Sequence, residues 1–83
     1  MSDITNQLIR ALELDRDGDW DTAHRIVQSI EHRGAYMVHA YLHRKEGVLS
    51  NAEYWYKRAK KKMPRYDLAR EWQELCDYIT ADR

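Results

Sequence analysis

Three histidines have the residue type and spacing that could hold a metal ion. His39 and His43 stand four residues apart, so on a helix their imidazoles lie one above the other on the same face. His24 belongs to an earlier helical stretch and could approach from a neighbouring helix. Imidazole nitrogens are good ligands for zinc and related metals, so a metal or small-ligand site is one hypothesis for function. Its further ligands would come from His32, Glu46 or Glu53.

The same histidines also suit a purely structural role, packed or hydrogen-bonded in a core. The residue after His39 is Ala40, whereas the usual zinc-protease motif has a glutamate there. No serine, cysteine or carboxylate pair has the arrangement of a nucleophile with its base. Cys76 lies on an apolar stripe and is expected to be a small core residue. We therefore expect no enzymatic activity and no cofactor.

A cluster of cations in the second half of the chain could bind an anionic partner. It lies beside Tyr54 and Tyr66, and such a patch could follow a phosphate backbone. A solvated helix end is the plainer alternative, because cations are favoured near a helix C-terminus. The 14 basic side chains of the whole chain are balanced by 14 acidic ones, which argues against a nucleic-acid-binding protein. The cluster consists of Lys57, Arg58, Lys60, Lys61, Lys62 and Arg65.

Charge is distributed unevenly along the chain. Residues 1–34 and 67–83 carry an excess of acids, whereas residues 35–66 carry an excess of bases. The basic middle can therefore pair with the acidic ends, either within one chain or between two chains of a homodimer. The single cysteine allows no intrachain disulfide, and no apolar run is long enough to span a bilayer. We expect a cytoplasmic protein that does not enter a membrane.

The elements that must position these side chains are predicted to be helices in one all-α domain, residues 1–83. Proline occurs once and glycine three times, each near the end of an amphipathic stretch. Gly34 is expected to close the second stretch and Gly47 the third. Apolar residues recur at three- and four-residue spacing along five stretches, which predicts five helices. Their expected bounds are 3–16, 19–32, 35–46, 50–63 and 67–80.

Short polar residues mark the expected helix starts, because their side chains can accept hydrogen bonds from unpaired backbone amides. Ser50 and Glu53 stand three residues apart, the spacing at which two side chains cap a helix start reciprocally. The other caps are expected at Ser2 or Asp3, at Asp19 and at Asp67. The connections between the helices are therefore short.

An internal repeat relates the first two predicted helix pairs. Gly18, Ala23 and Val27 are matched 29 residues later by Gly47, Ala52 and Tyr56. A fixed period of paired helices indicates a repeat protein. Small residues would let the two helices of each pair approach closely. They are Ala11, Ala23, Ala40 and Ala52.

Residues 36–64 resemble the tetratricopeptide repeat. The residues at that family's characteristic positions are Tyr36, Ala40, Gly47, Ala52, Tyr56, Ala59 and Pro64. The resemblance implies two antiparallel hairpins, residues 3–33 and 34–64, and a capping helix, residues 67–80, that shields the last hairpin. Residues 39–59 also resemble a group of small bacterial proteins, which adds no function.

The resemblance implies an interaction module that binds a protein or peptide partner, including a second copy of the chain. In tetratricopeptide proteins the first helix of each pair lines the binding face. An aromatic ring, a thioether and two cations there could hold an extended peptide with a carboxylate, with burial beneath the last helix as the alternative. These positions are Met37, Tyr41, Arg44 and Lys45. Tyr54 would be a further exposed contact, since three successive aromatic residues cannot all face inward on a helix.

Overall fold

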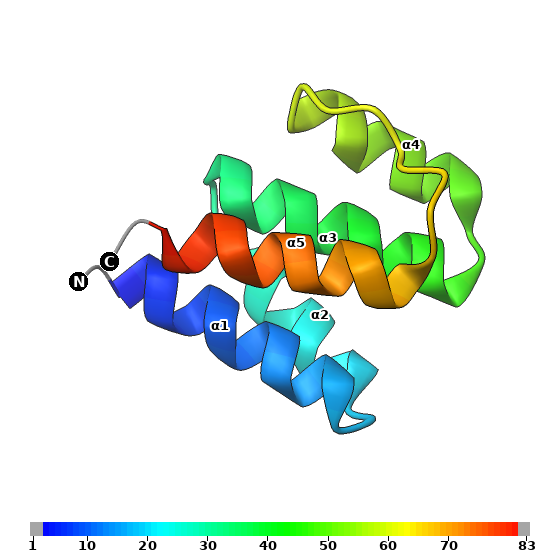
Figure 1. Cartoon of the computed structure of the whole chain (residues 1–83). Helices are drawn as coiled ribbons and strands as arrows, with labels where there is room; N and C mark the ends of the chain where they lie inside the picture. Colours follow the sequence, from blue (N-terminus) through cyan, green and yellow to red (C-terminus); the bar gives the residue numbers. More distant parts are fainter. Residues whose placement is uncertain (1–2, 82–83) are drawn as a thin grey trace.

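The computed structural model describes residues 3–81 and shows an all-α protein (Figure 1). No strand occurs within these residues. The described residues form five helices, which confirms the prediction of five. None of them is both long enough and apolar enough to cross a membrane. The helices are α1 (Asp3–Arg16), α2 (Trp20–Gln28), α3 (Arg33–Glu46), α4 (Leu49–Arg58) and α5 (Leu68–Thr80).

The helices pack around α3, which contacts each of the other four. Helix α1 lies against α2, and α4 lies against α3 (Figure 1). Helix α5 packs across α1 and α3, and its backbone stays away from α4. The last helix therefore covers the first helix of each pair, α1 and α3, and it shields the last hairpin on its α3 side.

Two apolar clusters form the interior. The larger one joins α1, α2, α3 and α5 and includes Leu12 and Leu75, both without solvent exposure. The smaller one joins α3 to α4 and includes Tyr56. Small side chains at the helix contacts allow the backbones to approach, as predicted. All four alanines predicted at these contacts are fully buried, namely Ala11, Ala23, Ala40 and Ala52.

The boundary between α2 and α3 differs from the prediction. Helix α2 ends at Gln28, short of the expected end at 32, and α3 begins at Arg33. Gly34 does not close the second helix, because it lies inside the first turn of α3. A Cβ atom at Gly34 would lie 2.8 Å from Cδ1 of Leu8. Glycine at this position therefore lets α3 approach α1.

Two of the predicted helix caps are confirmed. The side chains of Asp19 and Asp67 accept backbone hydrogen bonds at the starts of α2 and α5. Of the two residues expected to cap the first helix, Asp3 lies in α1 and Ser2 lies outside the described residues. These aspartates fix where α2 and α5 begin, and hence where the side chains of both helices point.

The prediction that Ser50 and Glu53 cap a helix start reciprocally is wrong. Helix α4 begins at Leu49, and its N-cap, Val48, makes no side-chain hydrogen bond. The helix ends at Arg58, earlier than expected. Helix α4 is thus a short element without a polar cap at its start.

Opposite charges pair within the chain. The Arg44 guanidinium lies 2.8 Å from the Glu71 carboxylate, and Nζ of Lys45 lies 3.0 Å from the Asp15 carboxylate. The basic middle of the sequence thus contacts both acidic ends inside one molecule. Both pairs help to hold α3 in place, because Asp15 lies on α1 and Glu71 on α5.

Candidate metal centre

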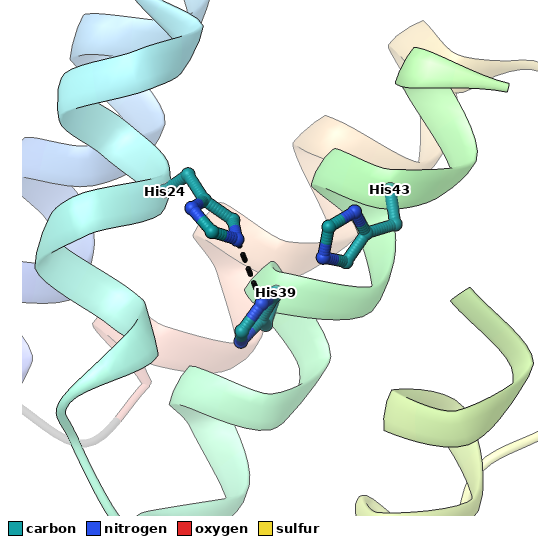
Figure 2. Close-up of side chains that lie close together, drawn as sticks. All are labelled: His24, His39 and His43. Atoms are coloured by element: carbon teal, nitrogen blue, oxygen red, sulfur yellow. Dashed lines mark hydrogen bonds between the residues drawn. The ribbon is translucent and has the colours of Figure 1, made fainter. Parts of the chain in front are cut away.

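The three histidines suggested by the sequence meet between α2 and α3 (Figure 2). His24 projects from α2, and His39 and His43 project from successive turns of α3. One ring nitrogen of each lies within 4.8 Å of the other two. Among the described residues, no other group of three His, Cys, Asp or Glu side chains converges in this way. The structure therefore brings together the three histidines that the sequence offered as one hypothesis for a site.

Two of the rings already stand close to the separation that a metal requires. Nε2 of His24 lies 3.0 Å from Nε2 of His39. Two nitrogens bound at about 2.05 Å to one tetrahedral zinc ion lie about 3.3 Å apart. Without metal, one ring must donate a proton and the other accept it. A bound ion would replace this hydrogen bond with only a small movement of the two rings.

The third ring is oriented by a carboxylate. Nδ1 of His43 lies 3.0 Å from Oε1 of Glu46, one turn along α3. When Nδ1 donates its proton to Glu46, the lone pair of Nε2 is free to bind a metal. Metal-binding histidines commonly have such a carboxylate partner, which fixes the tautomer and the ring orientation. The sequence suggested Glu46 as a ligand, whereas the structure gives it this supporting contact.

Two tryptophans cover the ends of the histidine cluster. The Trp20 ring stacks on His24 with centroids 4.9 Å apart and an interplanar angle of 8°. The Trp55 ring of α4 stacks on His39 with centroids 3.9 Å apart and an angle of 16°. Sequence reasoning missed these contacts. The four-residue spacing of Trp20 and His24 could have revealed the first, but no sequence signal places Trp55 beside His39.

The environment of the cluster favours neutral imidazoles. Burial, together with the neighbouring His24 and His43, lowers the pKa of His39 to about 3. Burial and the proximity of His43 also lower the pKa of His24, although Glu46 and Asp21 oppose that shift. A neutral imidazole has the lone pair that a metal needs, whereas a protonated one must first lose its proton. Both rings are therefore ready to coordinate at neutral pH.

One ring atom in the cluster has no hydrogen-bond partner. Nδ1 of His39 is buried and unpaired within the described part of the chain. Leaving a buried polar atom unpaired costs about 1–3 kcal/mol. An apolar side chain would fill the same space without this cost. A metal bound at Nε2 of His39 would leave this Nδ1 unpaired as well, so the unpaired atom does not decide between a metal site and packing.

Two other residues suggested as ligands lie outside the cluster. Nδ1 of His32 accepts a hydrogen bond from the backbone N–H of Gly34 at 3.0 Å and so caps the start of α3. Glu53 is exposed on α4 and does not belong to the converging group. The candidate centre therefore consists of three imidazoles supported by Glu46.

The face of α3 that was expected to bind a partner is mostly covered. Met37 and Tyr41 are 5% and 3% exposed. The hydroxyl of Tyr41 donates to Asp15 at 3.1 Å. Lys45 stays exposed at its end but also contacts Asp15. The expectation that Met37, Tyr41 and Arg44 line an open face is wrong, because α1 and α5 pack against this side of α3.

Arg44 belongs to a buried network that joins three helices. Its guanidinium donates to Glu71, whose side chain has no solvent exposure, and to the backbone carbonyl of Tyr66. The hydroxyl of Tyr56 donates to the same carboxylate at 2.6 Å. Burial and this hydrogen bond raise the pKa of Tyr56 well above its usual range. The network ties α3, α4 and α5 together and gives Arg44 a structural role.

Tyr54 and the basic cluster remain on the surface. Tyr54 is 56% exposed, as predicted. The guanidinium carbon of Arg58 lies 4.5 Å from the centroid of the Tyr36 ring and 5.1 Å from that of Trp55. The other five cations of the cluster lie at the end of α4 and in the connection to α5, exposed except for half-buried Lys61. Binding of an anionic partner by this cluster stays a prediction.

No protein-family model matches the chain, and no curated protein or solved structure matches it either. The tetratricopeptide resemblance and the binding of a protein partner therefore stay predictions. The geometry of the three histidines and the coverage of the expected partner face are the observations that bear on function.

Proposed function

We propose that this chain binds one divalent transition-metal ion of the zinc class through His24, His39 and His43. The observation that carries the proposal is the convergence of one nitrogen from each ring within 4.8 Å. Neutral imidazoles suit zinc, copper and nickel ions. The lowered pKa of His24 and His39 supports the proposal, because protons compete less for these nitrogens at neutral pH.

A bound ion would join α2 to α3 and so connect the two helix pairs. His24 supplies a ligand from α2, whereas His39 and His43 supply two from α3. An ion that binds only the folded chain stabilises it by about 2.7 kcal/mol when its free concentration is one hundred times its Kd. The metal would therefore act as a link between the two pairs as well as a bound ligand.

Metal binding is favoured over capture of a peptide by the α1 and α3 face. That face carries α5, which is anchored by the buried pair of Arg44 and Glu71. A peptide would have to displace α5 and leave this pair unmade, which is costly. Of the expected partner contacts, Tyr54 and the end of Lys45 remain exposed. The covered face of α1 and α3 is therefore weaker evidence for partner binding than the three converging rings are for a metal site.

We also infer that the two helix pairs form a tetratricopeptide-like arrangement. What supports it is the contact of α1 with α2 and of α3 with α4, with Ala23 and Ala52 fully buried at matching places in the repeat. An experimental structure in which the two pairs superpose would support the arrangement. Pairs that do not superpose would contradict it.

Zinc binding by tag-free protein tests the metal proposal. Protein stripped with a chelator and dialysed against zinc should retain one ion per chain. His24→Gln combined with His43→Gln should lose this ion, because only one imidazole of the cluster would remain. His32→Gln is the matched control, since His32 lies outside the cluster.

Circular dichroism would establish that each variant is still helical. Folded wild-type protein that retains no zinc would contradict the proposal. Retention of zinc by the double variant at the wild-type level would also contradict the proposal, because the ion would then be bound elsewhere.

A further inference from the structure

The histidine cluster offers a metal ion fewer protein ligands than a closed site has. Within residues 3–81, His24, His39 and His43 form the whole converging group. The Glu46 carboxylate is engaged with Nδ1 of His43. Structural zinc sites are closed by four protein ligands, whereas catalytic sites use three and keep the fourth position open. The ligand count therefore matches the open class of site.

The charge around the cluster favours an anion at the fourth position. Three neutral imidazoles leave the positive charge of a divalent ion uncompensated among its direct ligands. Glu46 offsets part of it through a hydrogen bond to one ring, and Asp21 also acts on His24 as a nearby negative charge. A cation, Arg58, lies over the Trp55 ring, which in turn stacks on His39. Because screening is weak in a partly buried site, an anion that binds the metal directly is favoured over a neutral ligand.

Access to the cluster limits the size of that anion. His39 and His43 are 4% and 8% exposed, whereas His24 is half-buried. The three rings turn toward one another between α2 and α3 (Figure 2). Trp20 and Trp55 stack directly on two of these rings. A bulky ligand would have to displace a tryptophan, whereas a small one could enter beside His24.

We propose that a metal ion held by His24, His39 and His43 keeps one exchangeable position that takes a small anion, such as hydroxide or azide. The inference rests on the proposed metal binding and specifies the ligand class of that same site. A centre with such an exchangeable position belongs to the class of metal sites that bind or activate a small ligand on the metal. A metal-bound water in such a site ionises near neutral pH and becomes a nucleophile.

Cobalt-loaded protein tests the exchangeable position, because the visible absorption of Co²⁺ depends on its ligands and their geometry. Tag-free protein carrying one equivalent of Co²⁺ would be titrated with sodium azide at an ionic strength held constant with sodium perchlorate. We expect a spectral change that saturates at one azide per cobalt. Perchlorate alone should leave the spectrum unchanged, because it coordinates metals poorly.

The outcomes separate the two proposals. Folded protein that binds no Co²⁺ and no Zn²⁺ would overturn the metal site itself. Stoichiometric Co²⁺ with a spectrum unaffected by azide would overturn the exchangeable position and leave metal binding intact. The variant His32→Gln should give the wild-type azide titration. Loss of the azide response in that variant would place the cobalt outside the cluster and overturn the inference.

Discussion

The guanidinium of Arg44 lies 2.8 Å from the carboxylate of Glu71, whose side chain is completely buried. This pair joins the last turn of α3 to the first turn of α5. Sequence reasoning expected Arg44 to bind a partner. The structure reverses that expectation, because removing either partner would leave a charge without its counterpart in the interior.

Arg44→Ala should therefore lower the free energy of unfolding by about 3–5 kcal/mol, the usual cost of leaving a buried charge unpaired. The control is Arg70→Ala, because Arg70 is exposed and lies 3.9 Å from Glu74. Loss of such an exposed pair should cost less than about 1 kcal/mol. Urea unfolding followed by circular dichroism would measure the free energy of unfolding of both variants. Equal stability of the two variants would mean that the Arg44 pair does not hold α5.

Glu46→Gln should weaken zinc binding by about 10–100-fold, the usual effect of removing a partner that orients a metal-binding histidine. The reason is that Glu46 is the carboxylate in contact with Nδ1 of His43. Glu53→Gln makes the same chemical change at an exposed position outside the cluster, and its zinc affinity should be that of the wild type. Competition with a coloured chelator would give both affinities. An unchanged affinity in Glu46→Gln would show that the carboxylate does not support the metal.

Ala52→Leu should destabilise the chain by about 1–3 kcal/mol through overpacking. Ala52 has no solvent exposure and lies where α4 meets α3. Ala69→Leu is the matched control, because Ala69 is exposed on α5. In a domain of this size a loss of 1 kcal/mol lowers Tm by roughly 4–8 °C. A thermal melt of Ala52→Leu that coincides with the wild type would show that space remains between α3 and α4.

Alkaline pH should destabilise the fold through two buried tyrosines. Burial is the largest cause that raises the pKa of Tyr41 and Tyr56 above the ordinary value of 10.0. Above pH 10 the unfolded chain loses these phenolic protons while the folded chain keeps them, so stability is retained below pH 10 and falls as pH rises beyond it. Absorbance of tyrosinate should show these two phenols ionising only as the helices melt.

The variant with both Tyr41→Phe and Tyr56→Phe should lose less stability between pH 10 and pH 12 than the wild type does. Tyr54→Phe is the control, because Tyr54 is exposed. If all tyrosines of the wild type ionise while the helical signal is intact, these two phenols are not shielded as the structure indicates.

The helices could be predicted from the sequence because their signals are local. Periodic apolar residues gave five helices, and Asp19 and Asp67 marked two of their starts. The end of α2 was placed too late, because Gly34 was taken as a helix stop. Glycine there serves the close approach of α3 to α1 instead, and that contact joins residues far apart in the sequence.

The candidate site was predicted only in part. The four-residue spacing of His39 and His43 placed both rings on one face of a helix, and the neighbouring helix then supplied His24. Helical periodicity shows which residues share a face but not which element covers it. For that reason the burial of Met37 beneath its neighbours and the stacking of Trp55 on His39 required the structure.

Within residues 3–81, α4 is the one helix whose backbone packs against a single other helix, α3. Elements with few neighbours open locally at a lower free energy than the rest of a protein. The amides of α4 should therefore exchange their hydrogens with solvent sooner than those of α1 or α5. Because α4 carries Trp55 over His39, each such opening would also uncover the histidine cluster. The rate at which a bound ion exchanges would then be set by local opening of α4, which is far faster than global unfolding.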